Sequence, residues 1–286
     1  MKEIAIILAC VPLYVINSFC DKYVSSKSGG AKGFFYNSVK FFICALILVP
    51  FFVTDAAPRF EWGAIVCGAG CGIMYAVNKT IMLEGYEKSS VPFMSFCHAA
   101  GMILPCVIGH FFWGETMKFT ALCGMLLAVV SVVLLKGGKS AGKKWESAGI
   151  IIGVVVFLMS GGVMIMQKFM GLYFTEQSVI AYNLYSFIVA FGSIAMFVNR
   201  EKPAENISKK NMILCAAGSA VSLCVISLVM TQMSGVVPSV IMFPLFNGLG
   251  IIAVSLGSML VFKEKMTPSK IIGLFMGVIG LCLINL

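Results

Sequence analysis

Runs of apolar residues, each about 20 residues long, recur from one end of this chain to the other. A helix of that length crosses the hydrocarbon core of a bilayer, and the polar stretches between the runs are too short to form a folded domain. The chain is 59% hydrophobic and 12% charged, so it lacks the residues needed to cover a water-soluble surface. The alternation typical of a membrane β-barrel is absent. These features predict an all-α, polytopic membrane protein.

The apolar runs and the polar residues between them predict ten transmembrane helices. The expected segments are 3–23, 31–53, 61–83, 91–113, 117–136, 147–170, 175–198, 210–233, 238–262 and 268–286. Pro12, Pro105 and Pro244 lie inside segments one, four and nine. Because proline removes a backbone hydrogen bond, these positions are expected to be either hinges or static kinks.

The second half of the chain repeats the first at an offset of 146 residues, with a three-residue gap in segment nine. The matched positions are Lys22 and Lys168, Tyr36-Asn37 and Tyr182-Asn183, Phe41 and Phe187, Val91-Pro92 and Val237-Pro238, Glu115 and Glu264, and Met117 and Met266. An odd number of crossings in each copy places the copies in opposite orientations. We therefore expect two inverted five-helix repeats, residues 1–145 and 146–286, a device common in transporters.

This pattern resembles the ten-helix permeases of the drug/metabolite transporter superfamily, of the EamA-like kind. The resemblance is carried by the two five-helix units, the Val-Pro turns, Gly-Glu-Thr-Met at 114–117 and Lys-Glu-Lys-Met at 263–266. Tyr75-Ala76-Val77-Asn78 also resembles the third-helix pattern of nucleotide-sugar transporters in the same superfamily. The resemblance implies transport through a central cavity lined by helices one to four and six to nine.

Two lysines, Lys40 and Lys79, lie inside apolar segments, where a charge costs roughly 3 kcal/mol or more. Either they snorkel to the surface or they have a function. We predict that both face the interior of the bundle and that at least one contributes to a substrate site with Tyr75, Asn78 or His98.

Other polar side chains occupy corresponding positions in the two repeats. They are Tyr36 and Tyr182, Asn37 and Asn183, and His98 and Asn247. These groups either bind a polar substrate or form interhelical hydrogen bonds, each worth ~1 kcal/mol. Both interpretations remain open, and all six are candidate substrate-binding residues.

The acidic residues are predicted to lie at helix ends, as with Asp21, Glu84, Glu115 and Glu264, and none deep in a segment. Buried lysines without acids disfavour organic cations and favour carboxylate, phosphate or neutral polar substrates. The sequence therefore predicts a secondary transporter for a small polar or anionic metabolite, such as an amino acid or other carboxylate, working by alternating access.

The alternatives are a lipid-head-group flippase and an intramembrane enzyme. The sequence contains no HExxH, no paired intramembrane acids and no GxS-type motif, so no catalytic residues are assigned. All eleven cysteines lie in or beside apolar runs without metal-ligand spacing, so no metal or cofactor is expected. The expected partners are a small-molecule substrate and the bilayer, with no nucleic acid, and the protein is expected to be a monomer or homodimer.

Ten crossings place both termini on one side of the membrane, expected to be the plasma (inner) membrane. That side carries Lys2, Arg59, Lys118 and Lys168. Apart from the embedded Lys40 and Lys79, the other fifteen of the 21 Lys and Arg residues, including those between Lys136 and Lys144, lie on the opposite side. Because basic short loops stay in the cytoplasm, the charges predict termini outside, whereas the resemblance implies termini inside.

Overall fold

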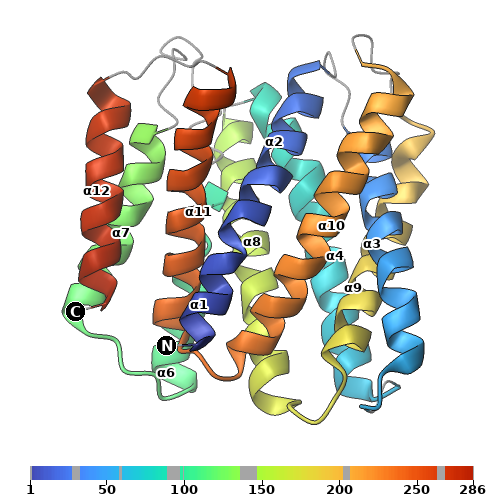
Figure 1. The fold of residues 1–286 in the computed structure, drawn as a ribbon, viewed down its shortest axis with the longest axis horizontal. Helices are drawn as coiled ribbons and strands as arrows, with labels where there is room; N and C mark the ends of the chain where they lie inside the picture. The colour runs from blue at the N-terminus through green and yellow to red at the C-terminus, as the bar shows by residue number, and fades with distance from the viewer. Residues whose placement is uncertain are drawn as a thin grey trace. The chain divides into compact units, whose positions relative to one another are not determined.

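The computed structural model describes residues 2–27, 33–57, 60–88, 97–98, 100–135, 147–201, 207–262 and 268–285. These residues form helices and no strand (Figure 1). The helices are α1 (Lys2–Ala9), α2 (Val11–Lys27), α3 (Phe34–Thr54), α4 (Trp62–Lys88), α6 (Ile103–Phe112), α7 (Phe119–Leu135), α8 (Ser147–Tyr173), α9 (Val179–Val198), α10 (Lys209–Ser234), α11 (Ser239–Phe262) and α12 (Pro268–Asn285).

Each of the ten predicted segments corresponds to a helix, and segment one corresponds to two, α1 and α2, which confirms the all-α, polytopic fold. Six stretches among the described residues are long and apolar enough to cross a membrane: Lys2–Val24, Phe34–Thr54, Trp62–Met82, Gly149–Tyr173, Val179–Val198 and Lys209–Ser234. The four remaining segments contain shorter apolar helices. Val91-Pro92, Glu264, Met266 and the loop Lys136–Lys144 lie outside the described residues.

Two of the prolines predicted to lie inside segments, in segments one and four, lie just after a break between helices. Segment one is divided at Cys10, and Pro12 is the second residue of α2. Pro105 is the third residue of α6, which follows a turn at Gly101. In the first turn of a helix, proline's missing N–H leaves no hydrogen bond broken. Pro244 differs because it lies inside the continuous helix α11.

The chain forms two compact units, and each unit draws on both halves of the sequence. Unit 1 contains residues 1–15, 85–165 and 237–286, and unit 2 contains residues 16–84 and 166–236. Three helices, α2, α4 and α8, therefore contribute to both units. The compact units do not coincide with the predicted repeats 1–145 and 146–286. The repeats describe a duplication within the sequence, and they stay a prediction.

In unit 2 the core forms where α3 packs antiparallel to α9, two helices that the repeat equates (Figure 1). The antiparallel direction follows from the ring contacts. Phe34 at the start of α3 stacks on Phe197 near the end of α9, with ring centroids 5.8 Å apart. Phe52 near the end of α3 meets Tyr185 in the first half of α9 at 6.1 Å. An antiparallel pair of equivalent helices is the arrangement that an inverted repeat produces.

Carboxylates join this helix pair at both ends. Glu201, just beyond α9, accepts hydrogen bonds from the backbone N–H groups of Phe34 and Phe35, at 3.0 and 2.7 Å. Asp55, just beyond α3, accepts a hydrogen bond from the hydroxyl of Ser178, the N-cap of α9. Glu201 lies 146 residues after Asp55, so the two contacts are related by the repeat offset. Each places a negative charge at the positive end of a helix dipole.

We expect Glu201→Ala to lower the free energy of unfolding by about 1–3 kcal/mol, because the first N–H groups of α3 would lose their charged acceptor. Thermal denaturation of the detergent-solubilised protein measures this change. Glu176→Ala is the matched control, since Glu176 is exposed in the turn before α9. Equal melting temperatures for the two variants would contradict the assigned capping role.

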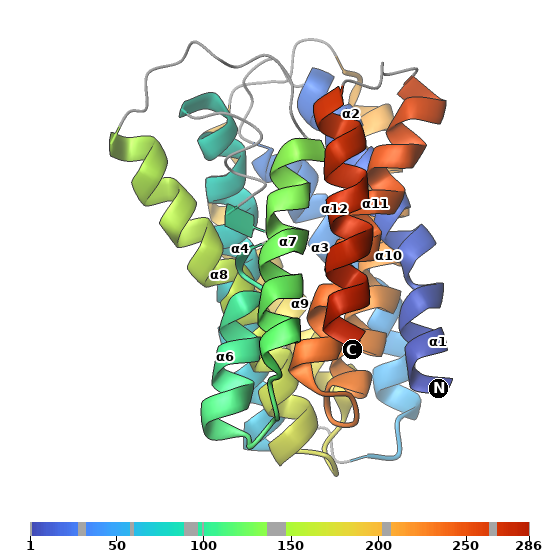
Figure 2. The same ribbon diagram turned by 90° about the vertical axis from the view of Figure 1, so that its left-hand side faces the viewer.

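In unit 1 the corresponding pair is α7 with α12, also antiparallel (Figure 2). The Ser269 hydroxyl at the start of α12 donates to the Leu134 carbonyl at the end of α7, at 3.2 Å. Near the other end of α12, a methyl group on Gly280 would approach the Gly124 carbonyl to 2.7 Å. The two backbones therefore lie close enough that glycine is needed at this crossing, as in small-residue packing of membrane helices.

Glu115, part of the motif at 114–117, caps another helix of unit 1. Its Oε2 accepts a hydrogen bond from the Ser239 backbone N–H at 2.8 Å, at the start of α11. Its Oε1 lies 3.3 Å from the Ser239 hydroxyl. The motif therefore has a structural role here, since the carboxylate satisfies a helix end that would otherwise lack an acceptor.

Candidate functional site

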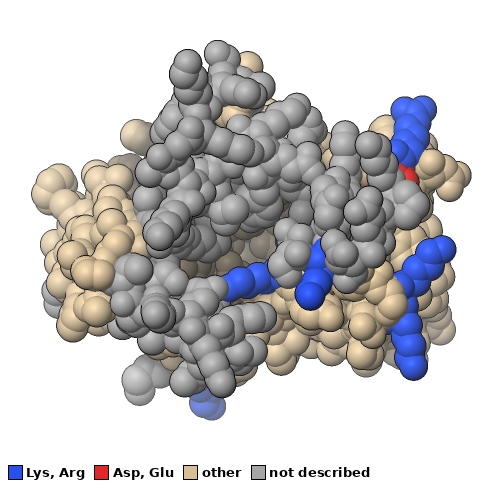
Figure 3. All heavy atoms as spheres, turned by 90° about the horizontal axis from the view of Figure 1, so that it is seen from above, with Lys and Arg blue, Asp and Glu red and all other residues tan. Residues whose placement is uncertain are grey.

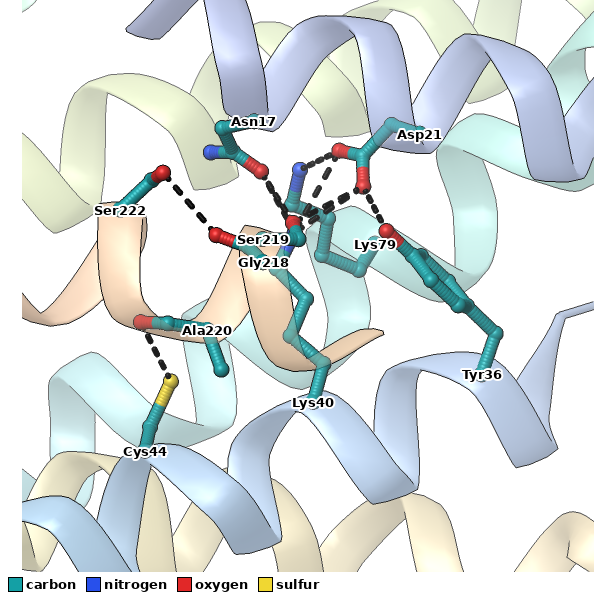
Figure 4. A network of polar contacts seen from close by, with 10 residues as sticks. All are labelled: Asn17, Asp21, Tyr36, Lys40, Cys44, Lys79, Gly218, Ser219, Ala220 and Ser222. Atoms are coloured by element: carbon teal, nitrogen blue, oxygen red, sulfur yellow. Dashed lines mark hydrogen bonds and ion pairs between the residues drawn. The ribbon is translucent and has the colours of Figure 1, made fainter. Parts of the chain in front are cut away.

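A cluster of charged side chains lies inside unit 2, centred on Asp21 (Figure 4). The Lys40 Nζ atom is 3.0 Å from Asp21 Oδ1, and the Lys79 Nζ atom is 3.2 Å from Asp21 Oδ2. One carboxylate from α2 therefore bridges one ammonium from α3 and one from α4. The structure brings together the two lysines that the sequence identified as candidates. The acidic residue between them, Asp21, was not among those candidates.

Helical spacing explains why these side chains meet. Asn17 and Asp21 are four residues apart on α2, and Tyr36 and Lys40 are four residues apart on α3, so each pair lies on one helix face. The two faces point toward one another in Figure 4. The Tyr36 hydroxyl donates to Asp21 Oδ1 at 2.7 Å, and the Lys40 ammonium donates to Asn17 Oδ1 at 2.8 Å.

The two oxygens of Asp21 have different surroundings. Oδ1 accepts from the Tyr36 hydroxyl and the Lys40 ammonium, and the Ser219 hydroxyl of α10 lies 3.4 Å away. Oδ2 lies 3.2 Å from Lys79 and 3.4 Å from Lys40. Lys79 therefore meets the oxygen with the smaller number of close donors.

The two lysines also differ in exposure. The Lys40 side chain is 0% exposed, whereas Lys79 is 21% and Asp21 is 33% exposed. Lys40 does not snorkel to the surface, and its ammonium is compensated by Asp21 and by the amide oxygen of Asn17. That amide oxygen also accepts from the Ser219 hydroxyl, which is itself fully buried. Lys40 is thus an internal group, and Lys79 is the accessible cation.

The remaining candidates on α3 and α4 lie near the cluster in sequence but have other surroundings. Tyr75 packs in an aromatic group, with its ring 5.9 Å from Phe41 and 6.3 Å from Phe187. Asn37 and Asn78 are both buried. For Tyr75 the described contacts favour a packing role, and the substrate role of all three stays a prediction.

The positions that the 146-residue offset equates with this cluster carry neutral residues. At the 146-residue offset, Gln167 replaces Asp21 and Ser186 replaces Lys40. The Tyr182 hydroxyl, which corresponds to that of Tyr36, has no nitrogen or oxygen hydrogen-bond partner among the described residues. Asn183 donates to the Val179 carbonyl at 2.8 Å and accepts from the Ser227 hydroxyl at 2.5 Å. The predicted repeat therefore does not reproduce the charges of the cluster at the equivalent positions.

His98 and Asn247 belong to unit 1, whereas the charged cluster belongs to unit 2. The His98 Nδ1 atom lies 3.2 Å from the Ser160 hydroxyl of α8, which also bonds the His98 carbonyl at 3.0 Å. Asn247 donates to the Phe243 carbonyl one turn earlier in α11, at 2.9 Å. The described bonds of these two residues are interhelical or local contacts within their own unit.

Asp21 is the residue of the cluster whose position along its helix differs from the prediction. It was expected at the end of segment one, whereas α2 continues to Lys27 and carries Asp21 inside the helix. The four-residue spacing of Asn17 and Asp21 is a signal that could have located this polar face. Nothing in the sequence marks Ser219, which reaches the cluster from α10.

The next question is whether side chains in the described part of the chain are grouped as metal ligands. No group of three His, Cys, Asp or Glu side chains among these residues is placed to hold a metal ion. All eleven cysteines are free thiols.

Comparison with known proteins shows which family the first part of the chain resembles. Residues 1–136 match the model of the EamA-like transporter family, which belongs to the drug/metabolite transporter superfamily. Over these residues the chain is similar to EamA-like transporters. The resemblance inferred from the sequence is thereby confirmed over these residues, and EamA-like proteins are transporters and not enzymes. Asp21, Lys40 and Lys79 all lie within the matched EamA-like region.

A solved structure described only as "Crystal structure of protein" shares the fold of this chain. The TM-score is 0.79 at 11% sequence identity, over 100% of this chain and 98% of that chain. This similarity extends the shared fold beyond residue 136 to the whole chain. A search of curated proteins finds no match.

Proposed function

We propose that this membrane transporter is a secondary transporter of a small anionic or polar metabolite, such as an amino acid or other carboxylate, working by alternating access. The family supports transport, and the charged cluster supports the class of substrate. The observation that carries the proposal is the ratio of two ammonium groups, Lys40 and Lys79, to one carboxylate, Asp21. These three side chains carry one net positive charge, which an anion neutralises.

The exposed side of the cluster supports this choice. An anion approaching the cluster meets Lys79 and the Oδ2 side of Asp21, since Lys40 is completely buried. An organic cation would have to approach two ammonium groups, which repel it in a low-dielectric site. A neutral polar substrate would gain hydrogen bonds from the cluster but no net charge attraction.

Uptake by proteoliposomes tests the proposal. A thermal-shift screen of amino acids, organic acids, nucleobases and sugar phosphates selects ligands, because a ligand that binds the folded state raises its apparent stability. Uptake of the best ligand by the wild type is then compared with uptake of the same ligand by the Lys209→Met variant, in which an exposed lysine is replaced. Uptake of organic cations and no anion would refute the proposed substrate class. Movement of labelled lipid without uptake of any soluble ligand would favour the flippase.

The membrane orientation is a separate prediction. Seen from the end where α2 ends and α3 begins, Lys and Arg far outnumber Asp and Glu among the described residues (Figure 3). We expect this basic end to face the cytoplasm of the plasma or inner membrane, with both termini outside. In a cysteine-free background, an impermeant thiol reagent added to whole cells should label Ala57→Cys and not Ser140→Cys. The reverse labelling would establish the orientation that the family resemblance implied.

A further inference from the structure

We propose that Asp21 is an internal competitor for the transported anion. Asp21 forms an ion pair with Lys79 when no substrate is bound, and an anion binds by replacing Asp21 as the partner of Lys79. Asp21 thereby sets how tightly an anion binds. This inference rests on the proposed function and adds a role for an acidic residue inside a site for anions.

The geometry assigns different roles to the two lysines. Lys40 is held by Asp21 Oδ1 at 3.0 Å and by Asn17 Oδ1 at 2.8 Å, with no exposed surface. Lys79 is partly exposed and lies 3.2 Å from the partly exposed carboxylate of Asp21. Moving Lys40 away would strand a buried charge, whereas Lys79 can exchange one anionic partner for another at an accessible position. Lys79 is therefore the exchangeable cation, and Lys40 is a positioning residue.

Charge balance gives the exchange a direction. Without substrate, two ammonium groups share one carboxylate. When a monoanion binds Lys79, Asp21 remains with Lys40, and each cation then has its own anion. The Tyr36 hydroxyl, 2.7 Å from Oδ1, keeps Asp21 in position during this exchange. The site therefore fits an anion whose charged group can take the place of a carboxylate oxygen beside Lys79.

This mechanism predicts that removing the charge of Asp21 tightens anion binding, although Asp21 belongs to the site. Asp21→Asn alone would leave Lys40 buried without a counter-charge, so the comparison is made in a Lys40→Met background. Methionine fills the buried space without a charge, and Asp21 still has Lys79 and Tyr36 as partners. The informative pair is thus Lys40→Met against Lys40→Met/Asp21→Asn.

The probes are acetate and inorganic phosphate, titrated against detergent-solubilised protein with the melting temperature as the readout. We expect about a twofold to fivefold lower Kd for the double variant, the factor expected for loss of one partly exposed competing ion pair. Lys40→Met/Glu176→Gln is the control, since it removes one exposed negative charge elsewhere. Adding Lys79→Met to the double variant should abolish the gain.

Unchanged or weaker anion binding in Lys40→Met/Asp21→Asn would overturn the competitor role, as would an equal gain in the Glu176→Gln control. These outcomes are distinct from failure of the proposed function, which is judged by wild-type uptake. Anion uptake by the wild type without an affinity gain would refute only the competitor role. An affinity gain that depends on Lys79, without anion uptake by the wild type, would refute only the proposed transport substrate.

Discussion

Replacing Asp21 with alanine is expected to lower the free energy of unfolding by about 3–5 kcal/mol, because Lys40 would remain as an uncompensated buried charge. The Lys40 side chain is 0% exposed, so its ammonium depends on its protein partners for compensation. Equilibrium unfolding in detergent, or the melting temperature where unfolding is irreversible, measures the loss. No other replacement considered for this protein is expected to destabilise it as strongly.

A second replacement separates charge from packing. If the cost arises from the buried ammonium, Asp21→Ala/Lys40→Met should recover most of the lost stability, since a buried ion pair replaced by apolar residues is often neutral or stabilising. The two residues touch, so their effects should be strongly non-additive. Equal stability of Asp21→Ala and the double variant would show that Lys40 is not the stranded charge.

Replacing Lys79 with methionine is expected to reduce anion transport about tenfold to a hundredfold while leaving the fold intact. A hydrogen bond to a charged group is worth about 1.5–3 kcal/mol, and 1.4 kcal/mol corresponds to a factor of ten. Asp21 keeps Lys40, Tyr36 and Ser219 as neighbours in this variant, so its buried side does not change.

The measurement is the initial rate of uptake in proteoliposomes, with the melting temperature as a check on folding. Lys209→Met is the matched control, because it removes an exposed lysine at the start of α10. Wild-type uptake by Lys79→Met would eliminate Lys79 as the substrate contact. Lys40→Ala, also expected to weaken anion transport, should act indirectly, because Lys40 positions Asp21 rather than reaching an accessible surface.

The membrane fold and two residues of the candidate site follow from the sequence alone, because they depend on composition and on order along the chain. Apolar runs long enough to cross a bilayer predicted the ten segments, and the 146-residue offset predicted two equivalent halves. The offset also relates Asp55 to Glu201, whose reciprocal caps on α9 and α3 appear in the structure. Lys40 and Lys79 were recognisable as candidates because a charge in an apolar segment is costly wherever the segment packs.

Tertiary structure decided which polar residues meet. Asp21, Asn17 and Ser219 become a single group with Lys40 and Lys79 only because α2, α3, α4 and α10 pack together in unit 2. Sequence patterns report the face of one helix and not the partner across from it, so Asp21 read as a helix-end residue. The same limit hid the unequal burial of the two lysines. The sequence by itself thus determined the membrane class, the helices and the two lysines. Only packing decided that a carboxylate lies between the lysines, because electrostatic partners are set by distances between helices.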